Sequence, residues 1–430
     1  MLGNENSLMI AKKLGASIGG KLGEKSLEEL ELAFVTKLFP KKFSNMPTLR
    51  TRQHVLLYWR RGFLKTTILR EFIKTIPEQF KVVRLSASTT EILLGSVYIP
   101  KNPFEKPRII PSILAGADFA IITEHSAFLK HGGPIQGRLA ILNDIWEGEK
   151  IVNNLVKLGQ IQTDPNQMPE LEKLGVKFEP KEAALSYEPD IVVFSASHPF
   201  DRKTLSLLLD CGHMDRFCIV QVQITPEIAR ECLQEEHVLD VSLQEKLRQQ
   251  NEILSQTRIK SIETAPNNLI KPLYERFFAL TEIPDFRIKG DVLRATAAHM
   301  VIRNFSQGNA KEVYTASDYS VEDADFVAER LGDFIEPRIN PLVAEGYPEV
   351  ETQHSKQYVK LHVCNFLEAS KSNGNNGEPL RAIVEYVQSK VSVHYQTVRN
   401  AVQELVSQSR VEKNPERFGY YRLVGTKKED

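Results

Sequence analysis

The sequence predicts an α/β fold in which a parallel sheet of five strands is covered by helices on both faces. Five short apolar runs alternate with helical patterns, as is typical of strands buried on both faces of a parallel sheet. The runs are Val55–Tyr58, Lys81–Leu85, Ala117–Ile122, Asp190–Ser195 and Phe217–Val222. Beyond them, residues 380–430 predict two helices and a β-hairpin. With 430 residues, the chain is long enough for two or three domains.

Composition limits the classes of function. The chain is 42% hydrophobic and 26% charged, the profile of a soluble globular protein. Its 55 basic and 55 acidic residues cancel, so the molecule has no bulk attraction for nucleic acid or anionic membrane, and any polyanion site must be local. Four cysteines without C-x-x-C spacing argue against a zinc site and a disulfide framework. Without an apolar span or a leader pattern, we expect a cytoplasmic protein with no membrane partner.

Changes in pattern along the chain predict its domain boundaries. Residues 1–50 are expected to form an N-terminal helical extension, with a helix over Ser26–Leu38 that begins at a Ser26 N-cap and has Glu29 three residues on. The run SNGNNGEP favours a flexible linker. The other predicted parts are an α/β core over 51–230, a helical lid over 231–345, a connecting helix and linker over 346–379, and a C-terminal domain over 380–430.

The stretch after the first strand predicts a phosphate-binding loop. Gly62 is followed by Lys65, Thr66 and an apolar-periodic helix. In a P-loop this arrangement places backbone N–H groups around phosphates, with the Lys on the β/γ-phosphates and the hydroxyl on Mg²⁺. The full pattern G-x-x-x-x-G-K-[ST] is not met, because Trp59 and Leu64 replace the two glycines. An ordinary strand, turn and helix containing Lys-Thr is the alternative.

Polar residues follow the predicted strands in a fixed order. Lys65 and Thr66 follow the first strand, Glu124 the third and His198 the fourth, while Arg216 directly precedes the fifth. With this order, residues 30–340 resemble the AAA+ ATPase module of the minichromosome maintenance (MCM) helicases, and the C-terminal part resembles their winged helix. The family's Walker A motif is G-D-P-G-x-A-K-S; the corresponding WRRGFLKT keeps the glycine, the lysine and a hydroxyl.

The resemblance implies roles for the other residues. Glu124 in AIITE matches the catalytic glutamate of Walker B, with Thr123 in place of the aspartate. His198 in FSASHP stands at the sensor-1 asparagine, where it could orient the attacking water. Arg216 in MDRF matches the arginine finger, which stabilises transition-state charge on a neighbouring subunit's nucleotide. Arg294, on a helix over Asp291–Arg303, is the candidate for sensor 2.

Each of these residues has a simpler interpretation. Glu124 could be a surface carboxylate, His198 a histidine satisfied by hydrogen bonds, and Arg216 the partner of Asp215 alone. The departures bear mainly on hydrolysis. Thr123 offers Mg²⁺ a neutral oxygen instead of a charged one, so metal affinity should fall. Arg60 and Arg61 add positive charge beside the loop, so the sequence supports nucleotide binding more than turnover.

An insertion between the third and fourth predicted strands matches the position of the family's pore hairpin. It extends over Gln160–Ala184 and follows Trp146–Gly159, which resembles the stretch leading into that hairpin. Lysines 173, 177 and 181 would contact DNA in the channel. A solvated charged loop is the alternative, because acidic residues outnumber these lysines.

The C-terminal pattern predicts a winged helix. Its helices are expected over Leu380–Lys390 and Val393–Ser407, with a hairpin over Arg410–Val424. In this fold the second helix enters the major groove of DNA. Binding of a protein instead of DNA is the alternative. The candidate DNA contacts are His394, Tyr395, Gln396, Arg399, Asn400, Lys413, Arg417 and Tyr420.

Two functions remain open from the sequence. The first is an ATP- and Mg²⁺-dependent DNA translocase or helicase in replication, working as a homo-oligomer such as a hexamer. In it, ATP is held between Lys65 and Thr66 of one subunit and Arg216 of the next. The second is a DNA-binding or scaffolding protein that keeps the AAA+ fold for assembly and does not hydrolyse ATP.

Overall fold

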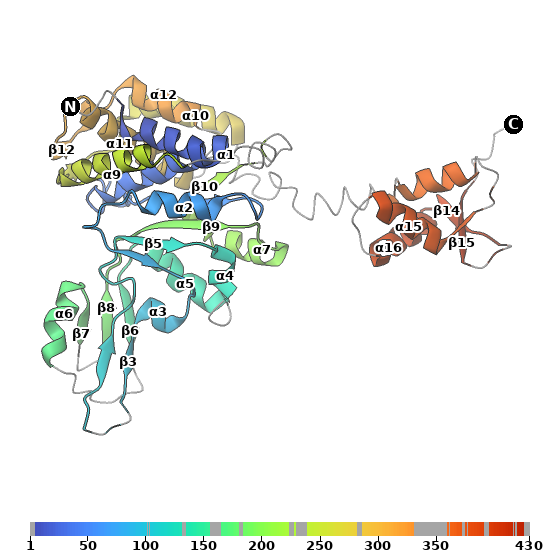
Figure 1. The fold of residues 1–430 in the computed structure, drawn as a ribbon, viewed down its shortest axis with the longest axis horizontal. Helices are drawn as coiled ribbons and strands as arrows, with labels where there is room; N and C mark the ends of the chain where they lie inside the picture. Colours follow the sequence, from blue (N-terminus) through green and yellow to red (C-terminus); the bar gives the residue numbers. More distant parts are fainter. Residues whose placement is uncertain are drawn as a thin grey trace. The chain divides into compact units, whose positions relative to one another are not determined.

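The computed structural model shows two compact units, residues 1–345 and residues 346–430 (Figure 1). The residues that the structure describes are 5–100, 102, 104–130, 135–154, 165–179, 184–222, 228, 239–281, 286–330, 359–360, 362–371, 375, 377–390, 395–415, 417 and 419–424. Across these ranges, no helix combines the length and the apolar character needed to cross a membrane.

A five-stranded parallel sheet forms the centre of the first unit, which confirms the predicted fold class at that level. All five predicted runs contribute a strand, and the strands lie in the order β10-β1-β9-β5-β2. Every residue of β1, β5, β9 and β10 is buried, which explains their uninterrupted apolar sequences. The bounds are β1 His54–Tyr58, β2 Val82–Arg84, β5 Phe119–Ile122, β9 Val192–Ser197 and β10 Phe217–Gln221.

The strand order creates a switch point beside β1. The connection from β1 runs toward one edge of the sheet, whereas the connections from β5 and β9 run toward the other. Right-handed crossovers then place the following helices on opposite faces. Accordingly, α2 (Lys65–Ile73) lies on one face and α4 (His125–Lys130) and α5 (Ile135–Trp146) on the other (Figure 1). Ligands of open α/β sheets bind at the carboxyl ends of strands beside such a point.

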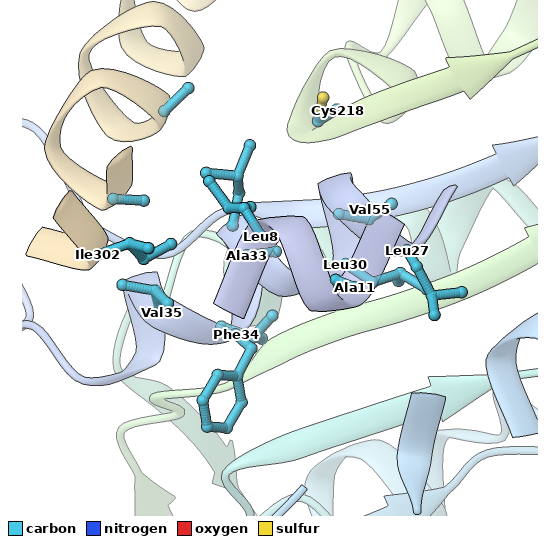
Figure 2. Close-up of a cluster of buried hydrophobic side chains, with 14 of the residues drawn as sticks. Leu8, Ala11, Leu27, Leu30, Ala33, Phe34, Val35, Val55, Cys218 and Ile302 are labelled. Atoms are coloured by element: carbon cyan, nitrogen blue, oxygen red, sulfur yellow. The ribbon is translucent and has the colours of Figure 1, made fainter. Parts of the chain in front are cut away.

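The N-terminal helix belongs to the centre of this unit. Helix α1 (Ser7–Lys37) contacts β1, α2, and two helices of the lid region, α9 (Val241–Gln256) and α11 (Phe286–Ser306) (Figure 1). Figure 2 shows its apolar side chains in one cluster with Val55 of β1 and Ile302 of α11. Phe34 stacks on Phe119 of β5 with ring centroids 5.8 Å apart. The segment expected as an extension therefore covers one face of the sheet.

The predicted start of that helix at Ser26 is wrong. The helix begins after Asn6, whose side chain accepts a hydrogen bond from Met9 N. Gly19 and Gly20 break it into two arms, and the Ser26 hydroxyl donates to Leu22 O (2.6 Å) within the second arm. Because Ser and Glu also occur inside buried helices, the capping pattern did not mark a terminus here.

The described residues of the lid region predicted over 231–345 form four helices; residues 231–238, 282–285 and 331–345 lie outside the described residues. The predicted helix Asp291–Arg303 falls within α11. Asp323 fixes two of the helices to each other by accepting hydrogen bonds from His299 and Arg303 of α11. The elements are α9 Val241–Gln256, α10 Asn267–Thr281, α11 Phe286–Ser306, α12 Val321–Glu329, and the paired strands β11 Ser261–Ile262 and β12 Val313–Tyr314.

Two small antiparallel sheets lie beyond the other face of the main sheet (Figure 1). Strands β3 (Ser96–Tyr98) and β4 (Arg108–Ile110) form one. Strands β6 (Ile151–Asn154), β8 (Ala184–Tyr187) and β7 (Lys177–Glu179) form the other, with α6 (Met168–Lys173) beside them. The predicted insertion Gln160–Ala184 therefore contains β7 and the first residue of its antiparallel partner β8, although residues 160–164 and 180–183 lie outside the described residues.

The second unit contains the predicted pair of helices and the hairpin. Helices α15 (Leu380–Lys390) and α16 (Tyr395–Ser407) pack beside the strands β14 (Val411–Lys413) and β15 (Tyr420–Leu423). A short strand, β13 (Glu378–Pro379), joins the same sheet. Helical residues from 359–371 bury Val359, Val363 and Leu367 in this core. The segment expected to connect the units thus contributes to the second one.

Candidate functional site

The loop between β1 and α2 adopts the backbone of a glycine-rich turn. Gly62 has φ +85°, and Leu64, which stands where the motif's second Gly belongs, has φ +53°. The left-handed region is costly for a residue with a side chain, so the loop holds Leu64 under strain. Lys65 N donates to Phe63 O (2.7 Å), which closes a tight turn around Leu64. The loop therefore has a left-handed residue at the position where the motif has its second glycine, although a leucine stands there.

Lys65 closes this loop. Its Nζ donates hydrogen bonds to the carbonyl oxygens of Trp59 (2.5 Å) and Arg60 (2.6 Å) and lies 5.3 Å from the Trp59 ring centroid. The Trp59 indole N–H donates to Phe63 O (2.7 Å) on the far side of the turn. Trp59 is fully buried, so the residue at the motif's first Gly position serves the core. A phosphate would compete with two neutral carbonyls for the ammonium, and charge favours the phosphate.

Glu124 and His198 meet at the carboxyl ends of β5 and β9, beside this loop. The distance from His198 Nδ1 to Glu124 Oε1 is 2.9 Å, and Ser126 Oγ donates to the same carboxylate oxygen (2.9 Å). Arg61 Nη2 lies 3.0 Å from His198 Nε2. A guanidinium can only donate, so Nε2 accepts from Arg61 and the Nδ1 proton points to Glu124. The imidazole thus joins the phosphate loop to the carboxylate.

The carboxyl ends of β1, β5 and β9 therefore bring Arg61, Glu124 and His198 together. Glu124 and His198 were predicted as site residues, and Arg61 was expected to add charge beside the loop. Ser126 was missed, because a serine two residues after the glutamate has no pattern of its own. Thr66, the predicted Mg²⁺ ligand, is exposed on the first turn of α2.

Arg216 lies at the amino ends of the strands, directly before β10. It forms an ion pair with Glu147 (2.5 Å between Nη2 and Oε1) and donates to Gly212 O. It also lines a cavity of about 330 Å³ in which basic residues outnumber acidic ones. The charged side chains lining the cavity are those of Lys42, Arg50, Arg52, Arg216, Arg294, Glu147, Glu149 and Asp215.

Arg294 shares this cavity with Arg216. Its Nε donates to Arg50 O (2.9 Å), and its Nη1 donates to Asp291 Oδ1 (2.8 Å). His54, the first residue of β1, lines the cavity, whereas the phosphate loop follows Tyr58, the last. At about 3.3 Å per residue, the length of β1 separates the two sites by roughly 15 Å. Arg294, the predicted sensor 2, therefore lies in the same cavity as Arg216, the predicted arginine finger, and far from Lys65 of the same subunit.

Three histidines of this unit, His54, His125 and His213, are buried. Burial lowers the pKa of His54 to about 4 and that of His125 to about 3. The pKa of His213 is held well below its usual value, mainly by burial and further by His125 and Arg216. All three imidazoles are therefore neutral at physiological pH.

The candidate DNA contacts of the second unit are on the surface. Helix α16 buries Val398 and Leu405 on one side and exposes Tyr395, Gln396, Arg399 and Asn400. Lys413 and Arg417 are exposed, and the Arg417 guanidinium lies 5.6 Å from the Tyr420 ring centroid. His394 lies outside the described residues.

Oxygen donors for a hard cation are few at the phosphate loop. The carboxylate of Glu124 and the hydroxyls of Thr66 and Thr123 follow the strands that end there. Within the described part of the chain, no group of three or more His, Cys, Asp or Glu side chains is placed to hold a metal ion. Compared with known proteins, the chain matches no protein-family model and no curated protein sequence.

Proposed function

We propose that this protein is an MCM-like AAA+ ATPase that binds ATP between two copies of the chain and acts on DNA as a translocase or helicase. The observation that carries the proposal is the division of the site between two edges of one sheet. Lys65, Glu124 and His198 follow the carboxyl ends of strands, whereas Arg216 and Arg294 line the cavity at the amino ends. One nucleotide can use both sets only if the second set comes from another copy.

The residues of the loop fit a nucleotide. A Cβ on Gly62 would meet nothing within 4 Å, so the approach to the backbone is open there. Lys65 would exchange the carbonyls of Trp59 and Arg60 for phosphate oxygens, and Arg61 would supply a second cation. The Thr66 hydroxyl would hold Mg²⁺ together with the phosphates, the usual mode for this ion. When bound, ATP supplies the phosphoanhydride whose hydrolysis drives movement on DNA.

Glu124 is the group that would polarise water. In the structure its carboxylate accepts hydrogen bonds from His198 and Ser126, and Arg61 holds the other nitrogen of the imidazole. A phosphate that attracts Arg61 frees His198 Nε2. The imidazole, which also lies 3.2 Å from Ser126 Oγ at this nitrogen, would then keep its contact with Glu124.

A second function has its own support. In the family that the chain resembles, a charged Mg²⁺ ligand stands where this chain has Thr123. The neighbouring carboxylate, that of Glu124, already contacts His198 and Ser126. Those facts favour a protein that binds ATP for assembly without hydrolysing it.

Nucleotide binding is tested by thermal unfolding with and without ATP and Mg²⁺. A ligand at 100 times its Kd stabilises the native state by about 2.7 kcal/mol, so the melting temperature should rise. Lys65→Ala should abolish the rise, and omission of Mg²⁺ should reduce it. Lys74→Ala is the matched control, because Lys74 caps the far end of α2 and pairs with Glu71. No rise for the wild-type protein at millimolar ATP would exclude the nucleotide site.

Turnover separates the two functions. The translocase should hydrolyse ATP, and single- or double-stranded DNA should stimulate it, whereas the scaffold should bind ATP without releasing phosphate. Glu124→Gln should abolish release and preserve binding if the carboxylate polarises water.

A further inference from the structure

A continuous hydrogen-bonded chain of buried side chains connects the Glu124 turn to the Arg216 turn. His125 directly follows Glu124 and begins α4, and its Nε2 lies 3.1 Å from Nε2 of His213. His213 directly precedes the short helix η2 (Met214–Arg216), which ends at Arg216. Both imidazoles are fully buried. Two residues assigned to different nucleotides are thus joined within one subunit by a single ring-to-ring contact.

The Asn143 end fixes where each ring proton lies, because the Ser195 hydroxyl at the other end can donate either to His125 or to Ile122 O (3.4 Å). Asn143 Nδ2 donates to Cys211 O (3.1 Å), so its Oδ1 faces His213 Nδ1 (2.8 Å) and must accept from it. His213 Nε2 is then an acceptor, and His125 Nε2 donates to it. His125 Nδ1 therefore accepts from the Ser195 hydroxyl (2.8 Å) of β9. Every hydrogen bond points the same way, and bonds aligned in this manner polarise one another.

The far end of the chain also reaches the ion pair of Arg216. Asn143 lies near the end of α5, and Glu147 N donates to Asn143 O (2.9 Å) one turn on. The Glu147 carboxylate pairs with Arg216. His213 thus lies on the turn that carries Arg216, and Asn143 lies one helical turn before the ion-pair partner of Arg216. Since buried groups are closely packed, the Glu124 turn cannot shift without moving this arrangement or breaking a buried hydrogen bond.

We propose that the buried chain Ser195–His125–His213–Asn143 couples a subunit's own nucleotide site to the arginine that it offers its neighbour. His125, His213 and Asn143 are positioning residues in this account. The inference rests on the proposed function, because it requires ATP at the loop and Arg216 acting on another copy. It adds that binding at one site changes affinity at the next through these side chains.

The physical link is tested without nucleotide, in the full-length protein with ¹⁵N-labelled histidine. The ring nitrogen signals should show His213 protonated at Nδ1 and His125 at Nε2. Arg216→Gln should shift the signals of His125, although a second imidazole lies between the two residues. Arg294→Gln is the control, because it removes the same charge from the same cavity at a side chain bonded to Asp291 and Arg50. If Arg216→Gln leaves the signals of His125 unchanged, the inference is wrong whether or not ATP binds.

The functional link is tested by titration with a non-hydrolysable ATP analogue. Binding to the wild-type protein should be cooperative, with a Hill coefficient above one. His213→Gln should lower the coefficient to one and keep binding at every site, with the midpoint raised only by the lost coupling. His299→Gln, at a buried histidine bonded to Asp323 in the lid region, should keep the cooperativity.

Asn143→Ala breaks the same chain from its other end and serves if His213→Gln does not fold. Non-cooperative binding to the wild-type protein, or cooperativity that survives both substitutions, would overturn the coupling while the nucleotide site stands. No binding at all would instead refute the proposed function, and the histidine spectra alone would then judge the link.

Discussion

Buried ionisable groups of opposite kinds make the stability of this protein depend on pH. His54 accepts a hydrogen bond from Val193 N and donates to Trp146 O, and its pKa is lowered to about 4. Glu31, at the end of a hydrogen bond from Asn251, has its pKa raised to about 7 by burial. Near neutral pH, therefore, His54 is neutral and Glu31 is about half protonated, and Glu31 becomes largely neutral only as the pH falls below 7.

The signs of these shifts decide the slope. As the pH falls below 6.5, the unfolded chain protonates its histidines while the three buried ones stay neutral, so stability is lost. Between pH 7 and 4.5 Glu31 acts in the opposite sense, because the folded state holds its proton and the unfolded chain does not. Each group changes the free energy of unfolding by about 1.4 kcal/mol per pH unit. The contribution of Glu31 to the pH slope therefore cancels that of one of the three histidines.

Glu31→Gln should therefore make the protein lose stability more steeply between pH 6.5 and 5. The expected change in slope is about 1.4 kcal/mol per pH unit, measured by urea unfolding at several pH values. His54→Gln should flatten the slope by a similar amount and is the matched control. A slope that Glu31→Gln leaves unchanged would mean that this carboxyl is ionised in the folded protein.

At the residue scale, the sequence identified Lys65, Glu124 and His198 because each follows a buried strand, where parallel strands bring their ends together. It did not show that Leu64 takes the left-handed conformation of the glycine it replaces. The side chain argues against that conformation, and only the surrounding loop imposes it. Glu147 was missed because its contact with the distant Arg216 leaves no local pattern, and Ser126 because a serine two residues after a glutamate has no pattern of its own.

Among the elements, α1 depends on two glycines. The two arms of this helix approach so closely that a Cβ on Gly15 would lie 2.2 Å from Gly23 O. Gly15→Ala should destabilise the protein by roughly 1–3 kcal/mol or more, as overpacking does, because the obstacle is backbone. Gly137→Ala in α5 is the control, since its Cβ would meet nothing within 4 Å and alanine favours a helix by about 1 kcal/mol. Unfolding midpoints in urea measure both, and equal effects of the two substitutions would contradict the packing.

Helix α16 is expected to carry the DNA contacts. Removing one phosphate contact lowers the salt dependence of binding by about 1 in slope, whereas loss of a base contact costs about 1–3 kcal/mol at the preferred site only. Arg417→Ala should show the first effect and Arg399→Ala the second, in binding measured across a salt series. Arg381→Ala is the control, because it removes an exposed arginine of α15 that pairs with Glu385. Equal affinity for all variants would move the DNA site away from this unit.

The five strands were predictable because each is short, apolar and buried on both faces. The first arm of α1 was not, since glycines at positions 15, 19 and 20 resemble a loop until tertiary packing requires them. The small sheets β3–β4 and β6–β8–β7 were missed for another reason. Their strands have only 3 or 4 residues, so their alternation is too brief to predict a strand.

At the scale of the whole molecule, the two sets of predicted site residues lie at opposite ends of the strands. Lys65, Glu124 and His198 follow the carboxyl ends of strands, and Arg216 and Arg294 line the cavity at the amino ends. Sequence motifs predicted both sets of residues. Their separation comes from the strand order and the position of the cavity, and under the proposed function it requires one nucleotide to be shared by two copies of the chain.

Mixing two inactive variants tests this division most directly. Lys65→Ala removes the loop lysine and leaves the cavity intact, whereas Arg216→Ala removes the finger and leaves the loop intact. Each variant alone should bind a fluorescent ATP analogue weakly, because every interface lacks one half. The mixture should recover tight binding, since interfaces form in which the Lys65 of one copy faces the Arg216 of another. If the mixture binds no more than the sum of its two components, the nucleotide is not shared between copies, and the account is wrong.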